Sequence, residues 1–183
     1  MNAKTNQRVV LTKRLLKESL LDILKHKHIQ DVSITELCGA AGINRSTFYA
    51  HYRTPVDVLT EIKGDFAQRM AASLAQPGER HSPRDYLEHI CTYIFEHRAE
   101  ERIILSNSSD DEVLQAALAS SFEVWGTSIP FLQLQGMDED TATLAMAFYY
   151  HGIFRVIREW IRRDINKSPQ EVAELLDTIL FKH

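Results

Sequence analysis

The feature that most constrains this chain is a series of closely spaced helix boundaries in residues 32–59, VSITELCGAAGINRSTFYAHYRTPVDVL. Ser33 and Glu36 have the S-x-x-E spacing of a capping box, in which each side chain bonds a backbone N–H of the other residue. Gly42 stands where a helix can end in the left-handed conformation, and Asn44 can cap a new helix. These signals predict two short helices separated by a tight break.

The two short helices are predicted over residues 34–41 and 45–52, with the spacing of a helix-turn-helix. A third boundary follows at once, because Thr54 suits an N-cap and Pro55 suits the first position of a helix. Apolar residues continue on one side of this next helix to about residue 75. The beginning of the chain is therefore predicted to be a small helical unit.

Residues 45–52 divide into an apolar and a polar face when they are placed on a helix. Phe48 and Tyr52 are one turn apart, so they share the inward face. In a helix-turn-helix the second helix enters the major groove of DNA, where polar side chains meet phosphates and base edges. An ordinary amphipathic surface helix is the alternative. The side chains left on the outward face are Arg45, Ser46, Tyr49, His51 and Arg53.

The net charge of −4 conceals an asymmetry along the chain. Residues 1–53 hold nine Lys and Arg against four Asp and Glu, a net charge of +5. Residues 54–183 hold the other 12 basic residues against 21 acidic ones, a net charge of −9. A basic region on an acidic body indicates that one end of the molecule meets a polyanion, which favours the DNA-binding interpretation.

The rest of the chain is predicted to be helical, because no segment shows the alternation of a strand. The expected fold class is all-α, with about nine helices. The apolar fraction of 44% is that of a globular protein. Further helices are expected to begin at Pro83 and Pro169 and to span about residues 99–105, 113–125 and 138–163.

Several classes of function find no support in the residue pattern. No apolar run approaches the roughly 18 residues of a membrane helix, and the N-terminus lacks a signal-peptide core, so a cytoplasmic protein is expected. Cys38 and Cys91 lie in apolar-periodic segments and are expected to be buried free thiols. His26 and His28 do not face each other on a helix, and no metal site or cofactor is expected.

The segment VSITELCGAAGINRSTFYAHYRTPVDVL resembles the DNA-binding domain of TetR-type (TetR/AcrR) transcriptional regulators. The resemblance covers about Leu15 to Ile62 and rests on the Ser that opens the second helix, the Ala-Gly-Ile turn and the Thr-Phe-Tyr-x-His-Tyr of the third. The segment YYHGIFRVIREWIRRDINKSPQEVAELL also resembles the last two helices of many members. The resemblance implies a helix-turn-helix domain at 1–54, a connecting helix at 55–75, and a helical ligand-binding and dimerisation domain at 76–183.

The resemblance also implies which residues contact DNA. Ser33 is expected to contact a phosphate, and Thr35 to lie near the bases. Family members commonly hold a phosphate with a lysine at the position of Pro55, so here either Arg53 or Thr54 supplies that contact or the contact is absent. The residues expected to face the groove are Arg45, Ser46 and Thr47, and those expected to contact the backbone are Tyr49 and His51.

The long helix near the C-terminus is apolar on more than one face, which indicates deep burial or pairing with another chain. Together with the terminal helix, it can supply two helices to a symmetric four-helix dimer interface. Gly152 would allow a close backbone approach there. The residues predicted for this interface are Phe148, Gly152, Val156, Trp160, Leu175, Leu176 and Ile179.

A small-molecule pocket is predicted between the helices of the second half. Aromatic residues at helical spacing are more often simple core residues, and that alternative stays open. The candidate lining residues are Tyr86, His89, Tyr93, Phe122, Trp125, Tyr150, His151 and Phe154.

The function implied is that of a repressor that binds a palindromic DNA operator as a homodimer and is released by a small-molecule effector. The alternative is a regulator that acts through a protein partner without such a ligand. An enzyme is disfavoured, because the chain has no Gly-x-Ser-x-Gly, His-Glu-x-x-His or phosphate-binding glycine loop.

Overall fold

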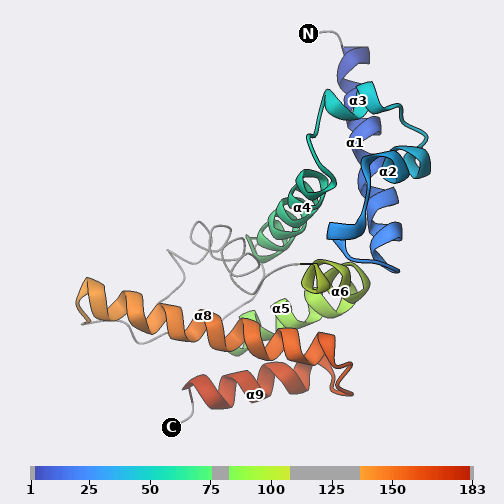
Figure 1. Ribbon diagram of the computed structural model, residues 1–183. Helices are drawn as coiled ribbons and strands as arrows, with labels where there is room; N and C mark the ends of the chain where they lie inside the picture. Colours follow the sequence, from blue (N-terminus) through green and yellow to red (C-terminus); the bar gives the residue numbers. More distant parts are fainter. Residues whose placement is uncertain (1–2, 76–82, 108–136, 182–183) are drawn as a thin grey trace. The chain divides into compact units, whose positions relative to one another are not determined.

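The computed structural model describes residues 3–75, 83–107 and 137–181. These ranges hold eight α-helices, one 3-10 helix and no strand, which confirms the all-α fold class (Figure 1). The chain forms two compact units, residues 1–65 and 66–183, and the division falls inside the continuous helix α4 (Pro55–Ala75). The functional division of the chain at residues 54 and 75 stays a prediction.

The first unit has a small core that several short helices share. Burying an apolar side chain fully contributes roughly 1.5–3 kcal/mol. Two of these helices have only eight and five residues and are not stable alone, so packing holds them in place. Its elements are α1 (Ala3–Leu24), the 3-10 helix η1 (Ile29–Asp31), α2 (Ile34–Ala41), α3 (Arg45–Tyr49) and the start of α4. Its completely buried side chains include Leu16, Leu20, Leu37, Phe48 and Leu59.

The predicted helix boundaries between α2 and α3 are confirmed. The Ser33 hydroxyl accepts the Glu36 N–H at 3.1 Å, and the Glu36 carboxylate accepts the Ser33 N–H in return. Gly42 ends α2 with φ +65°, in the left-handed region that favours glycine. The Asn44 Oδ1 accepts the Thr47 N–H at 2.7 Å and so caps α3. These local bonds set the break between the two helices.

α3 is shorter than expected. It ends at Tyr49, whereas the sequence predicted a helix to residue 52. The His51 N–H bonds the Phe48 carbonyl at 2.9 Å, a contact three residues apart that tightens the turn. The apolar pattern continues through this turn, because Tyr52 is still buried with Phe48. Periodicity alone therefore overestimated the length of the helix.

The second unit pairs its helices by packing α5 on α9 and α6 on α8. α8 and α9 lie side by side and run in opposite directions (Figure 1). The ring of Phe95 stacks on Trp160 with centroids 5.5 Å apart. The helix predicted over residues 113–125 lies outside the described residues. The elements of this unit are the end of α4, α5 (Pro83–Glu96), α6 (Arg98–Ser106), α8 (Glu139–Arg162) and α9 (Pro169–Phe181).

Both cysteines are buried free thiols, as predicted. Burial raises the pKa of the Cys38 thiol and raises that of Cys91 to about 12. Neither thiol is therefore activated as a nucleophile near neutral pH. In the described part of the chain, no helix combines the length and the apolar character that crossing a membrane requires.

Candidate functional site

The polar face of α3 is exposed, and its apolar face is not. Phe48 and Tyr52 are 0% and 5% exposed, so the predicted inward face is confirmed. Arg45, Ser46 and Tyr49 are exposed on the other side. Among the other predicted DNA contacts, Ser33, Thr35, Arg53 and Thr54 are exposed, while Thr47 and His51 are half-buried.

Arg45 and Tyr49 interact on this exposed face. The Arg45 guanidinium donates to the Tyr49 hydroxyl at 3.4 Å and lies 6.0 Å from the centre of its ring. The Tyr49 hydroxyl raises the pKa of Arg45, so the guanidinium stays charged. The Ser46 hydroxyl donates to the Asn44 side chain at 2.7 Å. The first turn of α3 thus presents one cation and several hydroxyl groups.

The start of α4 uses two backbone N–H groups that a phosphate could otherwise have bound. The Asp57 carboxylate accepts the N–H of Arg53 at 2.7 Å and that of Thr54 at 2.9 Å. These bonds hold the pKa of Asp57 below its usual range. Pro55 is buried and, as a proline, has no backbone N–H to donate. The Arg53 guanidinium is therefore the main group left here for a phosphate.

A charged cluster, which sequence reasoning missed, joins α1 to α4. Glu61 bonds Lys13 at 2.9 Å, Lys17 at 2.7 Å and the Tyr52 hydroxyl at 3.0 Å. Lys17 also pairs with Asp65 at 2.5 Å. Glu61 and Asp65 are four residues apart on α4, as Lys13 and Lys17 are on α1. This matched spacing is the sequence signal that could have predicted the cluster. Part of the basic excess of the first unit is therefore neutralised inside that unit.

Replacing Glu61 with glutamine is expected to destabilise the first unit by about 1–3 kcal/mol at neutral pH. Burial alone would raise the pKa of Glu61, but hydrogen bonds from Lys17, Lys13 and Tyr52 outweigh it and hold the pKa at about 2, against a usual 4.5. The carboxylate therefore stabilises the fold above pH 4.5, and this contribution disappears as the pH falls towards 2.

Urea unfolding at pH 7 and at pH 2.5 measures this effect. The difference between wild type and Glu61→Gln is expected to shrink sharply at the lower pH. Glu18→Gln is the matched control, because Glu18 makes only an exposed contact of 3.7 Å with Arg14. Equal losses of stability for the two variants at pH 7 would contradict this account.

The second unit contains a cluster of aromatic and polar side chains between the end of α4 and α5. Tyr93 stacks on His97 with centroids 4.3 Å apart, and Phe66 meets the Tyr93 ring edge-on at 5.8 Å. Among the buried side chains of the described residues, the Tyr93 hydroxyl alone lacks a hydrogen-bond partner. Arg69 interacts with it electrostatically, without the geometry of a hydrogen bond. The Tyr93 hydroxyl is therefore buried among aromatic rings and interacts with the Arg69 guanidinium.

Beside this cluster, α6 carries a buried acid. Burial and the neighbouring Glu100 raise the pKa of Glu101 to about 7, although Arg158 opposes the shift. Glu100 itself is held in an ion pair with Arg69 at 2.8 Å. The second unit thus contains an ionisable group that titrates near neutral pH.

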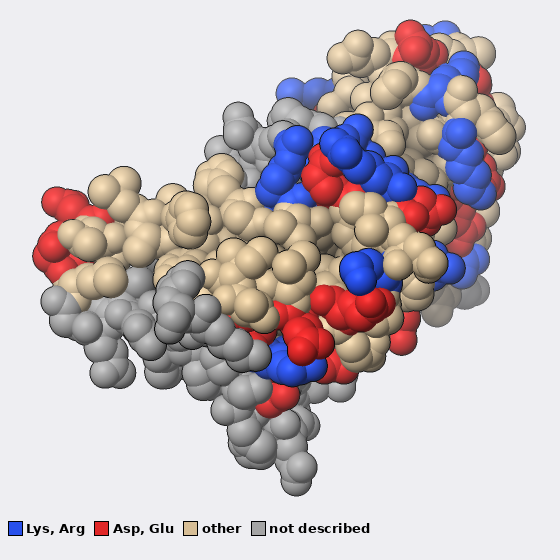
Figure 2. Space-filling model, turned by 90° about the horizontal axis from the view of Figure 1, so that it is seen from below, with Lys and Arg blue, Asp and Glu red and all other residues tan. Residues whose placement is uncertain are grey.

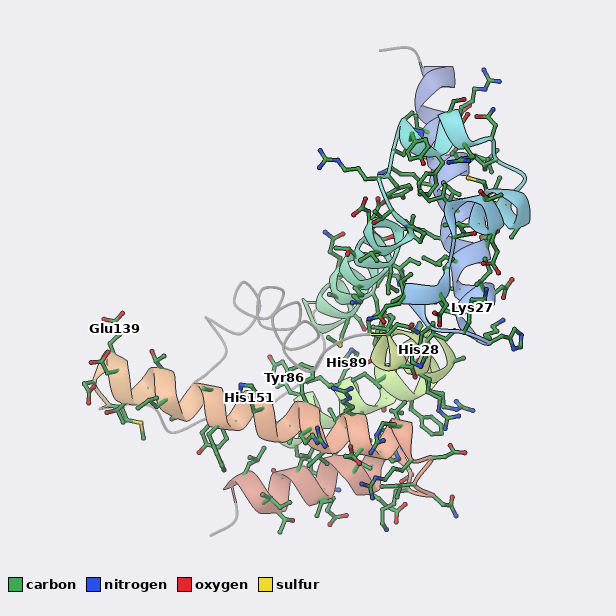
Figure 3. The ribbon with its side chains drawn as sticks, in the orientation of Figure 1. Lys27, His28, Tyr86, His89, Glu139 and His151 are labelled. Carbon is green, nitrogen blue, oxygen red and sulfur yellow. The ribbon has the colours of Figure 1, made fainter. Side chains whose placement is uncertain are left out.

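The residues predicted for a ligand pocket differ in their exposure to solvent. Tyr86 and His89 are half-buried on α5, and the His89 Nε2 lies 2.8 Å from the Ser73 hydroxyl (Figure 3). Tyr93 and Phe154 are buried and half-buried, but His151 is exposed on α8. Phe122, Trp125 and the side chain of Tyr150 lie outside the described residues. The described members of the predicted set thus lie on α5 and α8, and the pocket stays a prediction.

The residues predicted for a dimer interface also separate. Trp160 and Leu176 are 3% and 2% exposed and belong to the core of their own unit. Val156 is half-buried, and Gly152 is exposed. Phe148, Leu175 and Ile179 are 71%, 47% and 51% exposed, and Leu144, which precedes Phe148 by one turn, is 73% exposed.

We call the four residues Leu144, Phe148, Leu175 and Ile179 the apolar face of α8 and α9. Figure 2 shows a broad area of residues other than Lys, Arg, Asp and Glu on one face of the molecule. Glu139 and Asp140 make the first turn of α8 acidic. No group of three or more His, Cys, Asp or Glu in the described ranges could hold a metal ion.

Comparison with known proteins identifies the class of protein. Residues 81–182 match a TetR-type family model described as "Transcriptional regulator C-terminal region". This match covers more than half of the chain and defines a transcriptional regulator. The chain belongs to the TetR family of these regulators. No curated protein sequence matches it.

Solved structures show the same fold at low sequence identity. A TetR transcriptional regulator from Streptococcus agalactiae 2603V has a TM-score of 0.69 and 17% identity, over 98% of this chain and 99% of that one. The dihydroxyacetone kinase operon activator DhaS has a TM-score of 0.56 and 14% identity, over 93% and 94%. The TetR family repressor AlkX from Dietzia sp. has a TM-score of 0.51 and 16% identity, over 92% of each chain.

Proposed function

We propose that this TetR-family protein is a repressor that binds a palindromic DNA operator as a homodimer. The observation that carries the proposal is the exposed polar face of α3. Gly42 caps the end of α2 and Asn44 caps the start of α3, so both ends of the turn between the two helices are fixed. Exposed Arg45 and Tyr49 face away from the core, while Phe48 fixes α3 to the rest of the unit. This is the arrangement that a recognition helix needs in the major groove.

The homodimer is supported by the apolar face of α8 and α9. Leu144 and Phe148 are one turn apart on α8, and Leu175 and Ile179 are one turn apart on α9, so each helix carries a continuous exposed stripe. Isolated apolar residues are ordinary on a surface, but neighbouring stripes indicate an interface. A two-fold axis would pair this face with itself and form a four-helix bundle.

Release by a small-molecule effector is supported by the cluster around Tyr93. A buried hydroxyl without a partner costs about 1–3 kcal/mol, so a ligand that bonds it would bind favourably. Phe66 and His97 supply aromatic surface beside it. α4, which carries Phe66, is also the helix that begins next to the end of the helix-turn-helix.

The alternative proposal is regulation through a protein partner without such a ligand. The start of α4 favours it, because buried Pro55 replaces a phosphate-binding lysine and Asp57 occupies the adjacent N–H groups. Both proposals describe a protein that acts by binding and not by catalysis.

A gel-shift assay with genomic fragments of the source organism tests operator binding. Tyr49→Ala is expected to weaken binding about 10-fold, because it removes a contact worth roughly 1.4 kcal/mol. Gln30→Ala, at an exposed position on η1, is the control and is expected to bind as wild type does. A folded dimer that retards no fragment at low salt would refute the proposal. Placing the bound fragment before a reporter gene tests repression.

A further inference from the structure

We propose that Arg45 reads a guanine in each half-site of the operator, through a bidentate contact with the O6 and N7 atoms of that base. The inference rests on the proposed binding of DNA by α3 and adds which base the helix selects. It is argued from the hydrogen bonds that already occupy the side chains around Arg45.

The residues next to Arg45 already make hydrogen bonds within the protein. The Asn44 Oδ1 accepts both the Thr47 N–H and the Ser46 hydroxyl, each at 2.7 Å. A bidentate contact with adenine needs the amide oxygen of Asn or Gln to accept a hydrogen bond from the N6 amino group of the base. Because α3 itself contains neither Asn nor Gln, and its capping Asn44 uses that oxygen, adenine readout by this route is disfavoured.

Arg45 keeps the donors that guanine requires. A guanidinium has five N–H donors in a fixed plane, and the contact with the Tyr49 hydroxyl engages one NH2 group at one edge. Guanine presents two acceptors side by side in the major groove, and arginine is the side chain that most commonly meets them. Arg45 is exposed and is the first residue of α3, the part of a recognition helix that reaches base edges.

Tyr49 restricts the positions that Arg45 can adopt. The guanidinium lies 6.0 Å from the centre of the Tyr49 ring as well as 3.4 Å from its hydroxyl. A side chain held by a neighbouring residue loses less conformational freedom when it binds, which favours a directed contact over a general phosphate contact. Arg53, exposed near the start of α4, is the arginine better placed for a phosphate.

The substitutions Arg45→Lys and Arg45→Ala separate base readout from phosphate contact. Lysine keeps the charge but lacks the planar fork. Wild-type protein first selects binding sites from a random DNA pool. Variants of the selected site are then synthesised, with each of the four bases in turn at every position of the half-site. Affinities and salt slopes are then measured for wild type, both variants and Arg14→Ala, a control that removes an exposed arginine of α1.

Wild type is expected to prefer guanine at one position by about 5- to 150-fold. Arg45→Ala is expected to lose this preference, and Arg45→Lys to retain only part of it, because lysine lacks the planar fork. Arg45→Lys is expected to keep the salt slope of wild type, and Arg14→Ala to keep the preference. Two results would overturn the proposal. The first is a set of selected sites without an invariant guanine. The second is that Arg45→Ala lowers the affinity for all sites equally while Arg45→Lys keeps the affinity of wild type. The second result is that of a phosphate contact. Failure of wild type to select any sequence would instead refute operator binding itself.

Discussion

If the protein forms the proposed homodimer, replacing Phe148 with aspartate is expected to convert it into monomers. Phe148 is 71% exposed in one chain and lies at the centre of the α8 stripe, between Leu144 and Gly152. The substitution costs little in an isolated chain, because the side chain faces solvent there. In the proposed four-helix interface it would bury two unpaired carboxylates, which should weaken dimerisation roughly 100-fold or more.

Analytical ultracentrifugation over a range of concentrations measures this change, and circular dichroism confirms that the helices persist. Val10→Asp is the matched control, because Val10 is 61% exposed on α1, in the other unit. Ile179→Asp on α9 should behave as Phe148→Asp does. Operator affinity should fall in parallel, since two linked half-site contacts bind more tightly than either alone. An unchanged dimer in both the α8 and the α9 variants would exclude this face as the interface.

Replacing Phe48 with alanine is expected to destabilise the first unit by about 3–5 kcal/mol. Its side chain is completely buried, and its ring meets those of Tyr49 and Tyr52 with centroids 5.7 and 5.9 Å away. Alanine would leave a cavity beneath α3, and a helix of five residues cannot persist without that packing. Since the total stability of a domain is commonly 5–15 kcal/mol, the loss would remove much of the folded population.

Urea unfolding followed by far-ultraviolet circular dichroism measures the loss. Phe48→Leu is the control, because leucine fills more of the space and should cost no more than about 1.5 kcal/mol. DNA binding should fail for Phe48→Ala at concentrations where Phe48→Leu still binds. Equal unfolding midpoints for the two variants would show that the packing of this ring is not what holds α3.

Some elements could be predicted because their causes are local. Ser33, Gly42 and Asn44 each act through bonds to residues within four positions, so the boundaries of α2 and the start of α3 could be predicted from spacing alone. The same holds for the S-x-x-E box at Ser168, where the N–H of Ser168 donates to the Glu171 carboxylate at 2.8 Å and the N–H of Glu171 donates back at 3.2 Å.

The end of α3 could not be predicted in this way. The apolar spacing of Phe48 and Tyr52 fits a helix, but it fits a tightened turn equally well, because both place the two rings on the same side. The Phe48 carbonyl accepts both the His51 N–H at 2.9 Å and the Tyr52 N–H at 3.0 Å, so a bond three residues apart and a bond four residues apart share this turn. The period of the apolar residues predicts which side chains face inward. It does not predict whether the backbone hydrogen bonds join residues three or four positions apart.

The sequence by itself determined the all-α class and the polar face of α3, since these follow from helix caps and from the order of side chains along short segments. The family was indicated by the resemblance of residues 32–59 to TetR-type regulators. Only the tertiary structure decided which apolar residues remain on the surface. Trp160 and Phe148 are both large aromatic residues of α8, yet the core encloses one and leaves the other 71% exposed. The tertiary structure also decided that Lys13 and Lys17 bond Glu61. These residues are 48 and 44 positions apart in the sequence, so no local pattern could predict the contacts.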